Sequence, residues 1–170
     1  MEIDEFYVNA GDKGIKKENS RKRGLKRKGR GTYKSERPPI ITLYNRTDKR
    51  VLTSVETNLS KTKIWKMISE VNSDDLIVNT DEYTIYENLE SHPKVFKHLT
   101  VNHASKEYSN GISHVNNCEC FHSIIKPHLR KHRGISRRNL HLYVSFYTFI
   151  YNYKSNWFSK LLSLILCNDT

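Results

Sequence analysis

The stretch IDEFYV, residues 3–8, decides how the fold is interpreted. Its aromatic and β-branched residues are typical of a strand that packs into a core. Asp4 lies inside this apolar run, although burying an unpaired carboxylate costs several kcal/mol. We therefore predict a core strand over residues 3–8, and Asp4 becomes a candidate functional residue.

Four more strands are predicted from the same kind of pattern. Pro38 and Pro39 precede the next apolar run, and a polar turn over residues 45–49 follows it. A later run of three apolar residues is typical of a buried strand. The four predicted strands cover residues 40–44, 51–57, 76–78 and 95–101.

Helices are expected between and after the later strands. Ser60 is the expected N-cap of the first helix, residues 82–89 and 114–126 are predicted to be helical, and Pro127 should end or kink the latter. Ser136 is expected to cap a last helix. Apolar side chains at helical spacing form one stripe in the first helix and one in the last: Ile64, Met67, Ile68 and Val71, then Leu140, Tyr143, Val144, Tyr147 and Tyr151. This order of elements predicts an α/β fold with a five-stranded mixed sheet flanked by helices.

Positive charge is concentrated near the N-terminus. The 170 residues include 29 Lys and Arg against 18 Asp and Glu, a formal net charge of +11. Residues 13–36 hold much of this charge and few apolar side chains, which predicts a mobile loop ordered by an anionic partner, or a loop that is merely solvated. DNA is the simplest such partner, with phosphate contacts that are salt-sensitive and do not read sequence. The loop cations expected to bind DNA are Arg21, Lys22, Arg23, Lys26, Arg27, Lys28 and Arg30.

The remaining composition favours a cytoplasmic, DNA-associated protein with no membrane partner. Three cysteines are too few for a disulfide scaffold and suit a reducing compartment. The acidic residues 1–5 are unlike a signal peptide, and the apolar run over residues 157–167 is short of the ~20 residues that span a bilayer. Residues 1–154 are predicted to form one domain, and residues 155–170 a tail that is either an amphipathic dimer-contact helix or loosely packed.

Three carboxylates lie on separate predicted elements. Asp4 is in the first strand, Asp81 follows the strand over residues 76–78, and Glu119 is in the third predicted helix. A lone strand Asp is often an edge residue and a lone helix Glu is usually solvated, so the argument depends on all three converging. Metal-dependent phosphodiester chemistry uses such oxygen ligands, often around two ions about 3.5–4 Å apart. One polar face of the helix is formed by Asn116, Glu119, His122 and Lys126.

The order and spacing of several motifs are specific when they are taken together. Residues 114–126 match the form H-x-N-x-x-E-x-F-W-x-x-x-K, except that His122 replaces the Trp. The other motif stretches are residues 3–8, 29–32, 80–86, 101–108 and 140–152. Over residues 2–154 the chain resembles the catalytic domain of insertion-sequence DDE transposases, in the ISXO-like branch.

This resemblance implies an RNase H-like fold and a DNA transposition activity. It implies that Asp4, Asp81 and Glu119 are the catalytic, metal-binding triad for two Mg²⁺ ions, with Mn²⁺ able to substitute. It places His114, Asn116 and Lys126 near the DNA. The implied reaction is nicking at transposon ends followed by attack of the freed 3′-hydroxyl on target DNA, within a homo-oligomer. Members usually carry a DNA-binding segment before the first catalytic strand, so end-specific DNA binding is expected to be missing here, as in a fragment, a decayed copy or one half of a split protein.

Other interpretations stay open at this point. His114, Cys118 and His122 share one helix face and could bind zinc, but a single face cannot easily supply a tetrahedral ligand set. A Cys–His nucleophile pair lacks a third orienting group. The main alternative function is a catalytically decayed, basic nucleic-acid-binding fragment of a transposase, and another is a nuclease without strand transfer.

Overall fold

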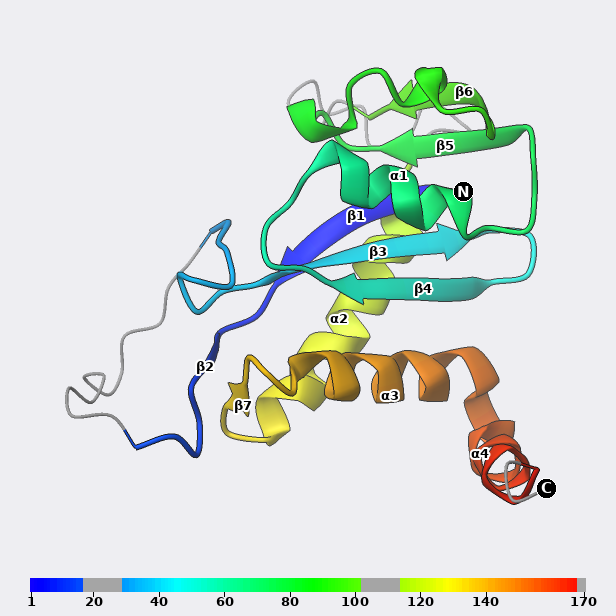
Figure 1. Ribbon diagram of the computed structural model, residues 1–170. Coiled ribbons are helices and arrows are strands. Elements are labelled where there is room, and N and C mark those ends of the chain that lie inside the picture. The colour runs from blue at the N-terminus through cyan, green and yellow to red at the C-terminus, as the bar shows by residue number, and fades with distance from the viewer. Residues whose placement is uncertain (17–28, 102–113, 168–170) are drawn as a thin grey trace.

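A five-stranded mixed sheet forms the centre of the computed structural model, with strand order β4-β3-β1-β5-β6 (Figure 1). The central strand β1 (Glu2–Tyr7) pairs antiparallel with β3 (Pro39–Asn45), which pairs antiparallel with β4 (Arg50–Val55). On its other side β1 runs parallel to β5 (Leu76–Thr80), and β5 runs parallel to β6 (Val95–Thr100). The predicted α/β class is therefore confirmed, and each predicted strand ends within two residues of its observed bounds.

The structure describes residues 1–16, 29–101 and 114–167. Most of the predicted basic loop lies outside these ranges, as does most of the motif stretch over residues 101–108. Of the loop cations expected to bind DNA, Arg30 is described. The others lie outside the described residues: Arg21, Lys22, Arg23, Lys26, Arg27 and Lys28.

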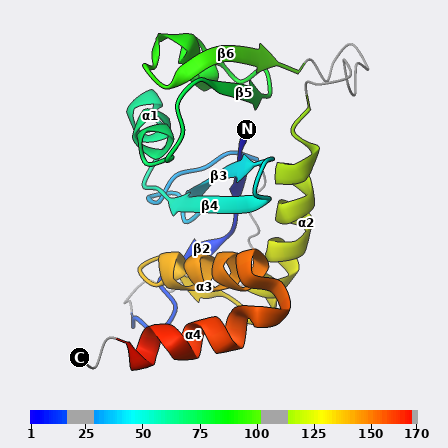
Figure 2. The same cartoon turned by 90° about the vertical axis from the view of Figure 1, so that its right-hand side faces the viewer.

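Helices cover both faces of the sheet (Figure 2). The helix α1 (Lys61–Ser69) packs on one face, while α2 (Asn116–Lys131) and α3 (Leu140–Tyr153) pack on the other. Side chains alternate along a strand, so Phe6 of β1 joins the core under α2 and α3, whereas Ile3 joins the core under α1. The predicted stripes of α1 and α3 both pack into these cores, as expected.

Three local predictions are wrong for identifiable reasons. Residues 82–89 do not form an α-helix but contribute to two 3₁₀ turns, η1 (Thr84–Tyr86) and η2 (Leu89–Ser91), because Asn88 between them adopts a left-handed conformation with φ of 60°. The helix does not end at Pro127, which lies inside α2; α2 continues to Lys131, and buried Leu129 packs against the core, while a kink at Pro127 stays a prediction. Asn139, not Ser136, is the N-cap of α3.

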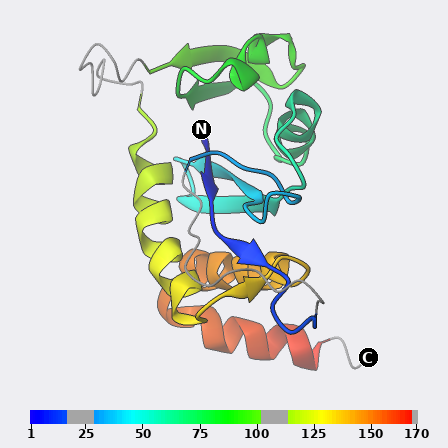
Figure 3. The same ribbon diagram turned by 90° about the vertical axis from the view of Figure 1, so that its left-hand side faces the viewer.

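A short parallel ribbon that the sequence did not reveal joins distant parts of the chain. It pairs β2 (Ala10–Gly11) with β7 (Ile135–Ser136), which contains the misassigned Ser136 (Figure 3). Beside it, Arg137 donates to the Tyr33 carbonyl at 2.8 Å and pairs with Asp12 at 2.8 Å. This arginine therefore fastens residues on both sides of the basic segment to the α2–α3 connection.

The C-terminal tail forms η3 (Lys154–Asn156) and the helix α4 (Trp157–Leu166), so a helix is present, while its dimer contact stays a prediction. Figure 1 shows α4 beyond the end of α3, away from the sheet. Its large apolar side chains Phe158, Leu162 and Ile165 are exposed. None of the helices in the described ranges is long and apolar enough to cross a bilayer.

Candidate active site

The pairing of strands in the sheet places two of the predicted carboxylates, Asp4 and Asp81, side by side. The parallel register pairs Glu2 of β1 with Asn79 of β5. Two residues further along each strand, Asp4 of β1 and Asp81 just after β5 therefore lie beside each other. The Asp81 carboxylate accepts a hydrogen bond from the Tyr83 amide at 3.0 Å, which holds it at the strand end.

The third carboxylate, Glu119, is placed by a buried acid in β1. Glu2 is completely buried and accepts hydrogen bonds from the backbone amides of Asn117 at 2.9 Å and Cys118 at 3.2 Å. These amides belong to the first turn of α2, where a negative charge is favoured by the helix dipole. Arg46 balances the charge of Glu2 with an ion pair at 2.7 Å. Glu2 thus fixes the start of α2, and with it Glu119, against β1.

Negative charge accumulates around Asp4. Burial and, after it, the nearby charges of Glu5, Asp81 and Glu119 together raise the pKa of Asp4 to about 7, although the Glu5 amide, which donates to it at 2.7 Å, opposes the shift. Side chains from three separate elements thus act electrostatically on one carboxyl group. Within the described ranges, however, no three His, Cys, Asp or Glu side chains form a group that could hold a metal ion.

His122 packs directly against Asp4. Its Nδ1 lies 3.5 Å from the Asp4 carboxylate, and its Nε2 lies 2.8 Å from the Thr42 hydroxyl. Burial lowers the pKa of His122 to about 3, and the charge of Lys126 lowers it too. His122 is therefore a neutral imidazole at physiological pH, and it closes one side of the Asp4 environment.

A second buried acid, Glu5, organises the other edge of the site. Its side chain is 4% exposed and accepts hydrogen bonds from the Tyr86 hydroxyl at 2.6 Å and from Arg30 at 3.4 Å. The Arg30 guanidinium also lies 3.5 Å from the centre of the Tyr83 ring. Arg30, predicted to contact DNA, therefore lies at a surface hollow that Asp81 also lines.

Replacing Tyr86 with Phe should lower the free energy of unfolding by about 1–3 kcal/mol, because buried Glu5 loses its shortest hydrogen bond. Urea denaturation at pH 7 measures the change. Tyr143→Phe is the matched control, since the Tyr143 hydroxyl has no hydrogen-bond partner in the described part of the chain. Equal losses in the two variants would contradict the prediction.

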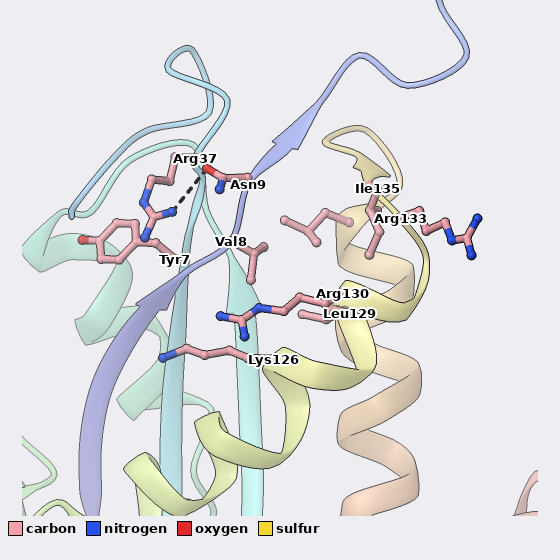
Figure 4. Close-up of a pocket in the computed structure, with 11 residues that line it drawn as sticks. Tyr7, Val8, Asn9, Arg37, Lys126, Leu129, Arg130, Arg133 and Ile135 are labelled. Atoms are coloured by element: carbon pink, nitrogen blue, oxygen red, sulfur yellow. Dashed lines mark hydrogen bonds between the residues drawn. The ribbon is translucent and has the colours of Figure 1, made fainter. Parts of the chain in front are cut away.

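A basic cavity of about 720 Å³ adjoins the carboxylates. Lys126 interacts with both the basic cavity and the carboxylates. Burial lowers its pKa, and the charges of Arg130 and Arg37 lower it too. The charges of Asp4 and Glu119 raise it. Figure 4 shows Lys126 and Arg130 extending from α2 toward the end of β1, where Arg37 lies beside Tyr7. Acids and cations therefore meet at Lys126.

The remaining predicted DNA-contacting residues lie at the start of α2. Asn116 is exposed at its first position, whereas His114 turns inward, with Nδ1 3.3 Å from Glu2. The sequence interpretation missed Glu2, Glu5, Arg37 and Arg130. The only signal for the first two was the density of acids in an otherwise apolar strand, and the two arginines gave none.

Comparison with known proteins identifies the family. The ISXO2-like transposase domain matches residues 1–152. The chain is also 36% identical, over 146 residues, to an uncharacterized protein in the transposable element ISH50 of Halobacterium salinarum. That alignment covers 85% of this chain and 49% of the relative, so the chain spans about half the length of the relative. No solved structure matches the chain. The matched range includes Asp4, Asp81 and Glu119, and the chain belongs to the ISXO2-like transposase domain family.

Proposed function

We propose that this chain is the catalytic domain of a DDE transposase with an RNase H-like fold. Asp4, Asp81 and Glu119 are its catalytic residues and hold two Mg²⁺ ions, for which Mn²⁺ can substitute. The observation that supports this assignment most is geometric: the β1–β5 register brings Asp4 beside Asp81, and the hydrogen bonds of Glu2 hold the start of α2, which carries Glu119, against β1. Membership of a transposase family and the mixed sheet are compatible with it.

The chemistry of the three donors suits the proposed ions, although in the described structure they are not gathered into a group that could hold a metal, so ion binding would have to draw them together. Carboxylate oxygens are the hard ligands that Mg²⁺ prefers, and crowded carboxylates repel one another unless a cation lies among them. When bound, the ions would stabilise charge on the attacking and leaving oxygens of a phosphodiester. His122 packs against one side of Asp4, and Lys126 lies close enough to Asp4 and Glu119 to interact with their charges.

The proposed reaction has two steps. Water first attacks a phosphorus atom at the transposon end, and the P–O3′ bond breaks to leave a 3′-hydroxyl and a 5′-phosphate. The freed 3′-hydroxyl then loses its proton and attacks a phosphorus of target DNA, so that one P–O bond forms and the target's own P–O3′ bond breaks. The partners are transposon-end and target DNA in a homo-oligomeric complex, and the location is the cytoplasm, on DNA.

Nicking of supercoiled plasmid in Mg²⁺ or Mn²⁺ tests the proposal. Wild-type protein should nick, chelator should stop it, and Asp81→Asn should lose nicking while it still binds DNA. Asp74→Asn is the matched control, because Asp74 is an exposed acid ahead of β5. DNA binding without nicking by the wild-type chain would overturn the proposal and favour a decayed nucleic-acid-binding protein.

A further inference from the structure

The basic cavity beside α2 has two kinds of wall. One kind is cationic and consists of Arg37, which precedes β3, together with Lys126 and Arg130 of α2. Arg37 is braced by Asn9, which accepts a hydrogen bond from it at 3.2 Å. Arg130 makes no ion pair within the described residues, and its head lies over the cavity in Figure 4, whereas Arg133 points away. A group of like charges of this kind favours an anionic ligand.

The other kind of wall is apolar. Val8, which follows β1, is partly exposed to the cavity, whereas Leu129, Ile135 and Leu140 lie in its floor and are at most 5% exposed. An inorganic phosphate would use the cations and leave this apolar surface in contact with water. The cavity volume of about 720 Å³ also falls within the range of about 300–1,000 Å³ typical of small-molecule sites. The ligand that uses both walls is an anion joined to an apolar ring.

We propose that this cavity receives one unpaired nucleotide of the DNA strand, with the phosphate against Lys126 and Arg130 and the base against Val8. This inference rests on the proposed function, since it takes the DNA to be the substrate. Paired bases cannot reach the apolar floor, so the nucleotide must be extruded or already unpaired. Extrusion costs a few kcal/mol and is cheapest where no partner base exists. Because Lys126 also adjoins Asp4 and Glu119, the nucleotide lies next to the bond to be cut.

Binding of labelled duplexes in EDTA at fixed salt tests this directly, without any requirement for catalysis. Three probes share one duplex sequence: blunt, with a single unpaired 3′ nucleotide, and with the same overhang lacking its base. The unpaired nucleotide should raise affinity by about three- to tenfold over the blunt duplex, because its base covers a small apolar surface in the cavity. The abasic overhang should lose most of that gain.

Two neighbouring charge variants separate the cavity from general attraction to phosphate. Arg130→Gln removes a cavity cation, and Lys131→Gln removes an exposed charge on the same turn of α2. Both should weaken blunt-duplex binding to a similar extent, because each removes one charge. Only Arg130→Gln should abolish the preference for the unpaired nucleotide. Circular dichroism and thermal melting establish that both variants are folded.

Several results would overturn the inference. Equal affinity for blunt and overhang duplexes would show that the cavity does not bind an unpaired nucleotide. Equal affinity for abasic and intact overhangs would show that only the phosphate is bound. Loss of the preference in Lys131→Gln would mean that charge, not the cavity, creates it. Normal plasmid nicking without an overhang preference would defeat this inference only, whereas an overhang preference without any nicking would defeat the proposed function only.

Discussion

Replacing Glu2 with Ala is expected to lower the free energy of unfolding by about 3–5 kcal/mol, the usual cost of removing one partner from a buried ion pair. The change leaves the amides of Asn117 and Cys118 without their side-chain acceptor. Arg46 keeps its bond to the His114 carbonyl but loses its ion pair. Small domains have only about 5–15 kcal/mol of stability in total. Urea denaturation should therefore show a large fall in the transition midpoint.

Glu2→Gln refines this prediction. The amide oxygen of Gln can still accept from the two α2 amides but no longer pairs as a charge with Arg46, so the loss should be smaller than in Glu2→Ala. Glu87→Ala removes an exposed acid and should change stability by no more than about 0.5 kcal/mol. If Glu2→Ala were as stable as wild type, or Glu2→Gln as unstable as Glu2→Ala, the assigned role of Glu2 would be wrong.

The second large effect concerns Asp4 and His122, whose titrations should cancel in the wild-type protein. With a folded pKa of about 7 against 3.8 unfolded, Asp4 makes the folded state bind an extra proton between these values, so its contribution to stability falls as pH rises. With a folded pKa of about 3 against 6.5, His122 makes the unfolded state bind the extra proton, so its contribution rises with pH. Between about pH 4 and 6.5 the two slopes oppose each other.

Single substitutions at Asp4 and at His122 should reveal the two opposite pH dependences of the free energy of unfolding. Relative to wild type, Asp4→Asn should lose stability as pH falls from 6.5 toward 4, and His122→Gln should gain it, each by up to about 1.4 kcal/mol per pH unit. Urea denaturation in chelator at pH 4.5, 5.5 and 6.5 measures both. The exposed His141 provides the control His141→Gln, which should follow wild type. Slopes of the same sign in the two variants would contradict the coupling.

The strands were predictable because their signals are local. The run over residues 3–8 carries its own aromatic and β-branched pattern, and the same holds for the other four strands. The β2–β7 ribbon has two residues in each strand, too few for any periodicity, so it could not be read from the sequence. The α2 helix continues past Pro127 because tertiary packing outweighs a local helix-breaking signal.

The candidate site was predictable only in part for a similar reason. Asp4, Asp81 and Glu119 stand out because acids follow or interrupt apolar runs, and the observed register brings the first two level. The contact between His122 and Asp4 joins residues more than a hundred positions apart. Arg37 and Arg130 line the same cavity only because of the way in which α2 crosses the sheet. Such long-range contacts leave no pattern in a single sequence.

The clamp formed by Arg137 has an evolutionary consequence. One side chain holds Asp12 and Tyr33 against the same turn, and the amide of Ala10 donates to the Glu36 carbonyl at 3.0 Å, so the two flanks of the basic segment are fastened together. Lengthening a closed loop is cheap, with each doubling costing only about 0.6 kcal/mol. Insertions and deletions between the flanks are therefore expected to leave β1 and its acids undisturbed. The length of this part of the chain can change while the sheet keeps its structure.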